Sequence, residues 1–169
     1  ASTMKLLQFK VPMARKSVAL GILLHAGQQI SGVNAIFFYS SMIIKDSPKA
    51  PVFLSFINLA VTLLAIWLLE RAGRRPIALF SVAGSAVALL ALAASYSNFP
   101  GAAPFLLISF VACFAVGLGP IPWMIVPEIF PATWPFTPTA ISICVSANWI
   151  TNIVVSGSFP FLADTFRED

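Results

Sequence analysis

The chain has 169 residues, of which 59% are apolar and only 9% are charged, whereas soluble domains carry about 25% charged residues. This composition excludes a soluble globular protein, because too few polar side chains are present to cover its surface. The net charge is +4, and the basic residues Lys5, Lys10, Arg15 and Lys16 precede the first apolar stretch, a clustering that indicates anionic lipid head groups and argues against nucleic acid.

The membrane-spanning segments follow from the apolar stretches. A helix needs about 20 mostly apolar residues to cross a bilayer, and five segments meet this requirement. We therefore expect an all-α membrane protein, with a basic cytoplasmic segment at 1–16, one membrane domain at 17–164 and a non-cytoplasmic tail at 165–169. The predicted spans are Val18–Ile44, Val52–Leu69, Ile77–Ser95, Ala103–Val126 and Thr139–Ala163.

The orientation follows from lysine and arginine in the segments that join the spans. Seven of these residues fall on the side of the N-terminal segment and the turn Arg71–Pro76, and three, Lys45, Lys49 and Arg167, fall on the other side. Basic residues favour the cytoplasmic side. The sequence therefore predicts a cytoplasmic N-terminus and, with an odd number of spans, a C-terminus on the opposite side.

The first span carries a cluster of primary amides. Its sequence runs Gly27-Gln28-Gln29-Ile30-Ser31-Gly32-Val33-Asn34, and on a continuous helix Asn34 can share the broad face of Gln28 and Gln29. Each amide both donates and accepts hydrogen bonds, which suits a ligand with several hydroxyl groups. Gly27 and Gly32 indicate a helix that bends or unwinds there. The alternative is that these amides only join helices; we favour the binding interpretation.

His25 lies one turn before this cluster. It has two interpretations, a proton relay or a neutral, hydrogen-bonded histidine at the wall of a pore. Because the chain has one histidine and no acid near it, the second interpretation is the better supported.

The second and third spans are more uniform. The second has one polar residue at its middle, Asn58, and the third has a row of small residues, Gly84, Ala88, Ala91 and Ser95. Small residues at this spacing allow two helices to approach closely. The pattern predicts that the third span is scaffold.

The fourth span contains the run Gly117-Leu118-Gly119-Pro120-Ile121-Pro122-Trp123. Proline removes an amide donor and clashes with the preceding turn, so a hinge or break is expected here. The Trp123 ring can stack on the C–H face of a sugar and donate from its indole N–H. The alternative is a tryptophan at the membrane interface.

The fifth span contributes a second set of amide and indole groups. Asn148 and Asn152 are four residues apart and share a helical face, and Trp149 lies beside them. Substrate binding and interhelical hydrogen bonding both remain open for these residues.

Four motifs in this order resemble the sugar porter family of the major facilitator superfamily, to which facilitative glucose transporters and fungal and plant hexose transporters belong. They are Gln28 through Ser40, which resembles the seventh helix; Glu70-Arg71-Ala72-Gly73-Arg74-Arg75, which resembles the loop between helices eight and nine; Gly119 through Trp123 with Pro127-Glu128-Ile129-Phe130, which resembles helix ten and the next cytoplasmic loop; and Asn148-Trp149 with Asn152, which resembles helix eleven.

The resemblance implies a twelve-helix carrier whose two six-helix halves rock about a central hexose site. It implies a hexose such as glucose as ligand, membrane lipid and the N-terminal half or another transporter chain as partners, and no cofactor. The residues implied to contact sugar or line its cavity are Gln28, Gln29, Asn34, Asn58, Trp123, Asn148, Trp149 and Asn152; those implied at the gates are Phe38, Tyr39, Gly119, Pro120 and Pro122; and those of the cytoplasmic charge network are Glu70, Arg71, Arg74, Arg75 and Glu128.

Three features depart from the family pattern. Residues Pro131–Pro138 contain no basic residue to pair with Glu128, and Ala115 stands where the family has an acid. The chain ends at Asp169, before a twelfth helix, and contains no helices one to six. The expected fold is therefore an incomplete C-terminal bundle of about five transmembrane helices.

The predicted function is hexose transport by alternating access, without enzymatic chemistry. Alternating access needs one bundle to rock against another, so this chain is expected to be inactive by itself. Two alternatives remain: a non-transporting sugar sensor or regulatory partner of a complete transporter, and a proton-coupled sugar symporter. Both the plasma membrane and an internal membrane such as that of the vacuole are compatible with the sequence.

Overall fold

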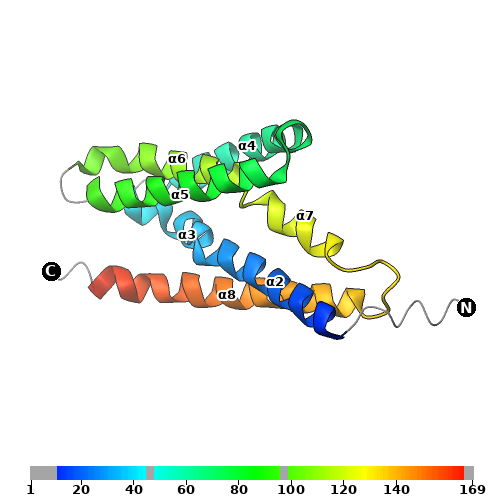
Figure 1. Cartoon of the computed structure of the whole chain (residues 1–169). Helices are drawn as coiled ribbons and strands as arrows, with labels where there is room; N and C mark the ends of the chain where they lie inside the picture. Colours follow the sequence, from blue (N-terminus) through cyan, green and yellow to red (C-terminus); the bar gives the residue numbers. More distant parts are fainter. Residues whose placement is uncertain (1–10, 45–47, 96–98, 166–169) are drawn as a thin grey trace, which may run out of the picture. The chain divides into compact units, whose positions relative to one another are not determined.

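A computed structural model describes residues 11–44, 48–95 and 99–165, and all regular elements among them are helices (Figure 1). The basic residues Lys5, Lys10, Lys45 and Arg167 lie outside these ranges. The helices are α2 (Val11–Ile30), α3 (Val33–Ile43), α4 (Ala50–Ala72), α5 (Arg74–Ser95), a short 3-10 turn η1 (Pro100–Ala102), α6 (Ala103–Val116), α7 (Pro120–Glu128) and α8 (Thr137–Thr165).

Four stretches are long and apolar enough to cross a membrane. They are Ala50–Ala72, Arg74–Ser95, Ala103–Glu128 and Thr137–Leu162. They correspond to the second, third, fourth and fifth predicted spans. Together with the absence of strands from the described residues, they confirm the all-α membrane fold class.

The first predicted span is not one helix, because Ser31 and Gly32 separate α2 from α3. Gly32 has a φ of 78°, a conformation that glycine adopts without a steric penalty. Gly27, which was also expected to mark a bend, lies inside α2. The interruption is therefore located at Ser31 and Gly32, and not at Gly27.

The fourth predicted span contains the expected break. Helix α6 ends at Val116 and α7 begins at Pro120, while the Gly119 N–H donates to the Phe114 carbonyl at 2.9 Å. Pro120 and Pro122 lie in the first turn of α7, where amide N–H groups lack a partner within the helix. The prolines therefore begin a new helix rather than distort an existing one.

The chain divides into two compact units. The terminal unit comprises Ala1–Ile30 and Pro122–Asp169, and the central unit comprises Ser31–Ile121. The terminal unit thus contains α2, most of α7 and α8, and the central unit contains α3 to α6.

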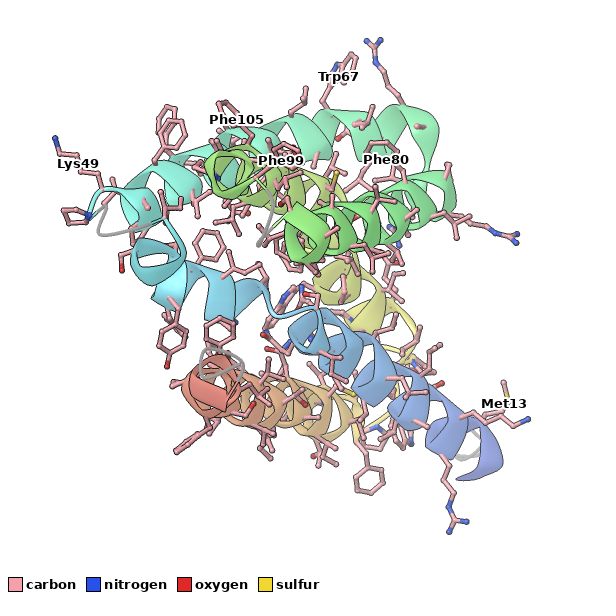
Figure 2. All side chains as sticks on the ribbon, turned by 90° about the vertical axis from the view of Figure 1, so that its left-hand side faces the viewer. Met13, Lys49, Trp67, Phe80, Phe99 and Phe105 are labelled. Carbon is pink, nitrogen blue, oxygen red and sulfur yellow. The ribbon has the colours of Figure 1, made fainter. Side chains whose placement is uncertain are left out.

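The core of the central unit forms around α6. Leu107, Phe110 and Val111 of α6 are completely buried, and they pack with Leu54 of α4 and Ala88 of α5. By contrast, α4 and α5 leave many large apolar side chains exposed, among them Trp67 on the outer side of α4 (Figure 2). In a membrane protein these side chains are expected to face lipid.

Close contacts between α5 and α6 depend on small residues. A Cβ atom at Gly84 would lie 2.7 Å from Cys113 Sγ, and one at Gly117 would lie 2.9 Å from the Ile77 carbonyl oxygen. Ser81 Oγ of α5 donates to the Cys113 carbonyl at 2.6 Å and accepts from the Leu118 N–H at 2.8 Å. The scaffold role predicted for the third span agrees with this packing.

In the terminal unit α2 packs along α8 (Figure 1). A Cβ atom at Gly21 would lie 2.6 Å from Cys144 Sγ, so glycine permits the approach. Cys144, Val126 and Phe130 form the buried core with Ala140. The turn before α8 is closed by Thr137 Oγ1, which donates to the Pro131 carbonyl at 2.7 Å.

Candidate functional site

Asn148 is the centre of a buried polar cluster between α2 and α8. Its Nδ2 donates to Gln28 Oε1 at 2.9 Å, and its Oδ1 accepts from Gln29 Nε2 at 2.9 Å. Gln28, Gln29 and Asn148 are 4%, 7% and 1% exposed. Two of the expected sugar-binding amides of α2 and one of α8 are thus brought together.

His25 completes this cluster. Its Nδ1 lies 3.1 Å from Asn148 Nδ2, and its backbone carbonyl oxygen lies 3.3 Å from the same nitrogen. The His25 side chain is 1% exposed. We name the group formed by His25, Gln28, Gln29 and Asn148 the amide cluster.

An aromatic side chain adjoins the amide cluster. The rings of Trp123 on α7 and His25 meet edge to face, with centroids 4.7 Å apart and an interplanar angle of 78°. Trp123 remains 45% exposed, so part of its ring is open to a ligand. A partly open indole beside buried amides offers both a stacking surface and hydrogen-bonding groups.

The other predicted residues of α8 differ in exposure. Asn152 is 8% exposed, and its Oδ1 accepts from Ser156 Oγ at 3.0 Å within the same helix. Trp149 is 56% exposed. Asn152 therefore has a partner within α8, whereas Trp149 presents a large accessible surface.

Asn34 and Asn58 lie in the central unit, on α3 and α4, and both are half-buried. The helical register that linked Asn34 to Gln28 and Gln29 does not hold, because Ser31 and Gly32 interrupt the helix that it assumed. The interruption at Gly32 places Asn34 on a separate helix.

The predicted gate residues follow the two helix interruptions. Phe38 on α3 is 62% exposed and Tyr39 beside it is half-buried. Gly119 precedes α7, and Pro120 and Pro122 lie in its first turn. The first set of predicted gate residues therefore follows the interruption at Gly32 in sequence, and the second set lies at the end of the interruption before α7 and in the first turn of α7.

The basic residues of the predicted charge network surround the junction of α4 and α5. Gly73, with a φ of 80°, ends α4, and Arg74 begins α5 directly after it. The Arg71 guanidinium lies 4.2 Å above the Trp67 ring, an arrangement typical of a cation–π contact. Glu70 and Arg75 are exposed here, and Glu128 is exposed at the end of α7.

The chemistry that this arrangement supports is hydrogen bonding by neutral groups. Within residues 11–44, 48–95 and 99–165, no group of three or more His, Cys, Asp or Glu side chains is placed to hold a metal ion. The sequence favoured a neutral, hydrogen-bonded His25 over a proton relay, but His25 was not counted among the sugar-binding residues. The spacing of three residues between His25 and Gln28, which puts both on one helical face, was the available signal.

Comparison with known families gives one match over nearly the whole chain. The sequence model described as "Sugar (and other) transporter" matches residues 1–168.

Individual transporters are also similar. Human solute carrier family 2, facilitated glucose transporter member 14, is 36% identical over 166 residues, which cover 92% of this chain and 32% of the relative. The chicken facilitated glucose transporter member 1 is likewise 36% identical, over 92% of this chain and 34% of its own length. The chain therefore spans about a third of these relatives.

Solved structures agree with this similarity. The proton:xylose symporter XylE bound to 6-bromo-6-deoxy-D-glucose superposes with a TM-score of 0.78 at 29% identity, over 88% of this chain and 33% of that one. The inward open conformation of the xylose transporter XylE from E. coli gives a TM-score of 0.76 at 31% identity, over 85% of this chain and 32% of that one.

Proposed function

Because the chain belongs to the sugar (and other) transporter family, we propose that it supplies hexose-binding residues of a membrane carrier that works by alternating access. The amide cluster carries this proposal. It presents neutral donors and acceptors on a buried surface next to the open part of the Trp123 ring, and an uncharged ligand with many hydroxyl groups matches those properties.

The relatives support a sugar as the ligand. Those named above are described as facilitated glucose transporters, and the structural neighbour as a xylose symporter bound to a glucose derivative. We extend this to the present chain as binding of a hexose such as glucose, with Gln28, Gln29 and Asn148 as hydrogen-bonding residues and Trp123 as a stacking platform. Asn34, Asn58, Trp149 and Asn152 are proposed as further contacts.

Sugar binding must compete with bonds inside the protein. Gln28 and Gln29 already bond to Asn148, so a sugar hydroxyl replaces or bridges existing hydrogen bonds. Such an exchange gains little net free energy per bond, typically about 0.5–1.5 kcal/mol. The proposed site therefore suits a ligand that must be released after each transport cycle.

Transport itself requires a second bundle of helices. Alternating access moves one bundle against another around a fixed site, and we propose that an N-terminal six-helix half or another transporter chain provides it. The gate residues Phe38 and Tyr39, and the charged residues at the α4–α5 junction and Glu128, are proposed to open and close that path.

Binding and flux test this proposal separately. Glucose binding to the 169-residue chain in lipid nanodiscs would be measured by calorimetry, and glucose uptake would be measured in proteoliposomes with and without the N-terminal half of a relative. We expect binding by the chain and flux only with the second bundle. Flux by the chain alone would contradict the need for a partner, and binding without flux in both preparations would favour a sugar sensor.

Two substitutions distinguish the site from the scaffold. Gln29→Leu removes an amide from the cluster and is expected to weaken glucose binding by about tenfold or more, with a smaller loss of melting temperature than Gly84→Leu causes. Gly84→Leu forces a branched side chain against Cys113 and is expected to lower the melting temperature first. The same change at Gln8, in the N-terminal segment, is the matched control for Gln29. Normal binding by an early-melting Gln29→Leu variant would make the cluster a purely interhelical contact.

A further inference from the structure

The His25 backbone identifies the orientation of the Asn148 amide. A carbonyl oxygen only accepts hydrogen bonds, so the Asn148 atom 3.3 Å from the His25 carbonyl must be the donor nitrogen. The opposite orientation would place two oxygens against each other. The two hydrogens of this nitrogen have Gln28 Oε1 at 2.9 Å and the His25 carbonyl oxygen at 3.3 Å as acceptors.

The same nitrogen then determines the protonation of the His25 ring. His25 Nδ1 lies 3.1 Å from Asn148 Nδ2. An amide nitrogen does not accept hydrogen bonds, so a proton on Nδ1 would face the N–H groups of Asn148 without an acceptor, and this contact favours an Nδ1 that carries no proton. The ring proton therefore resides on Nε2, and the ring is neutral.

We infer that His25 is a positioning residue for the proposed sugar site: its neutral ring accepts from Asn148 at Nδ1 and fixes the orientation of the Asn148 amide, and protonation of His25 releases that amide and weakens sugar binding. The inference rests on the proposed function in so far as it concerns sugar. The assignment of the ring protonation depends only on the geometry of α2 and α8.

Protonation has a defined effect on this cluster. A protonated imidazole donates from both nitrogens, so Nδ1–H would face the N–H groups of Asn148. Rotating the Asn148 amide by half a turn would relieve that clash but would bring Oδ1 against the His25 carbonyl and Nδ2 against Gln29 Nε2. Either response disrupts the hydrogen bonds that Asn148 makes with Gln28 and Gln29, the two glutamines that are proposed to meet the sugar.

Among the described side chains of α2, α7 and α8, no other charged group lies close enough to explain a pH response of the amide cluster. Helix α8 carries no acidic or basic side chain from Thr137 to Leu162. The titratable residue of α8 next to Asn148 is Cys144, one turn away. Helix α7 carries only Glu128, and α2 carries Arg15 and Lys16, ten and nine residues before His25. That separation is about 14 Å along the helix. A pH response of the amide cluster is therefore assigned to His25.

A first experiment measures the protonation of the two ring nitrogens of His25. His25 is the only histidine of the chain, so labelling with ¹⁵N-histidine gives the resonances of one residue. In lipid nanodiscs at neutral pH we expect an unprotonated Nδ1 and a proton on Nε2. A proton on Nδ1 at neutral pH would overturn the inference, whatever the outcome of the sugar experiments.

A second experiment measures glucose affinity of the chain from about pH 8 to about pH 5, the range in which histidine changes charge. We expect affinity to fall with pH in the wild type. His25→Asn keeps an acceptor oxygen on Cγ, close to the position of Nδ1, but does not titrate, so its affinity should approach that of the wild type at pH 8 and stay flat. His25→Leu has no acceptor. At every pH it should bind glucose about tenfold or more weakly than the wild type does at about pH 8.

The outcomes separate the two proposals. If the wild type binds no glucose at any pH, the proposed function fails. The ¹⁵N spectrum still tests which ring nitrogen of His25 carries the proton. If the wild type binds glucose and His25→Leu binds equally well across the range, the positioning role is wrong. A falling profile in His25→Asn that matches the wild type also overturns it, because a group other than His25 would then be titrating.

Discussion

At the scale of single residues, Asn148 joins three other polar side chains of the terminal unit. It bonds to Gln28, Gln29 and His25, and all four side chains are buried. A buried polar group that loses its partner costs the free energy of its desolvation. Removing Asn148 therefore affects three neighbours, whereas removing one glutamine affects one bond to Asn148.

This difference gives a prediction for Asn148→Leu. The change leaves Gln29 Nε2, Gln28 Oε1 and His25 Nδ1 without their Asn148 partner, so we expect a loss of unfolding free energy of about 1–3 kcal/mol, together with loss of glucose binding. Thermal melting and calorimetry on the purified chain measure both quantities. Asn152→Leu is the matched control, because Asn152 bonds to Ser156 of its own helix and should cost less. Equal effects at the two positions would argue against a central role for Asn148.

At the scale of helices, two serines of α5 provide an internal comparison. Ser81 Oγ bonds to both the Cys113 carbonyl and the Leu118 N–H, next to the break between α6 and α7. Ser85 lies one turn further along α5, and its buried Oγ has no partner among the described residues. Ser81 therefore stabilises the interrupted end of α6, whereas the hydroxyl of Ser85 is a net cost.

We accordingly expect Ser81→Ala and Ser85→Ala to act in opposite directions. Ser81→Ala leaves the Leu118 amide without its hydroxyl acceptor and should reduce the unfolding free energy by about 1–3 kcal/mol. Ser85→Ala removes a buried, unpaired hydroxyl and should be neutral or stabilising. Reversible unfolding of the two variants in the same detergent provides the measurement. A larger loss for Ser85→Ala than for Ser81→Ala would refute this account of the break.

At the scale of the whole molecule, the division into units follows the helix interruptions. The boundary between Ile30 and Ser31 lies at the end of α2, and the boundary between Ile121 and Pro122 lies two residues into α7. An interrupted helix loses the continuous hydrogen bonds that make it rigid. The two points where the chain passes between the units are therefore at or next to interruptions of the helical hydrogen bonding.

The orientation in the membrane is a further prediction at this scale. Arg71, Arg74 and Arg75 cluster around Gly73, and basic residues favour the cytoplasmic side. We expect Ala72→Cys to be protected from an impermeant thiol reagent in intact cells and Pro48→Cys to be labelled, in a background with Cys113 and Cys144 replaced by alanine. Both target positions are exposed, and Ala72 avoids the positive φ of Gly73. Labelling at position 72 with none at position 48 would reverse the orientation.

The sequence alone determined the membrane character, the helical fold class and the neighbourhood of both helix interruptions, because each depends on local properties. A run of about 20 apolar residues, a glycine with positive φ and a proline without an amide donor act wherever they stand in the chain. The same local reasoning failed for Asn34, because the break at Gly32 removed the helical register that it assumed.

Only the tertiary structure decided which polar groups meet. His25 and Asn148 are separated by 123 residues in sequence, and the pairing depends on how α2 packs against α8, where Gly21 and Cys144 permit a close approach. The orientation of one amide then determined the protonation of a ring on another helix. Helical periodicity places residues on a face, but it does not say which face of another helix they will contact, because that contact is set by side-chain packing between segments distant in sequence.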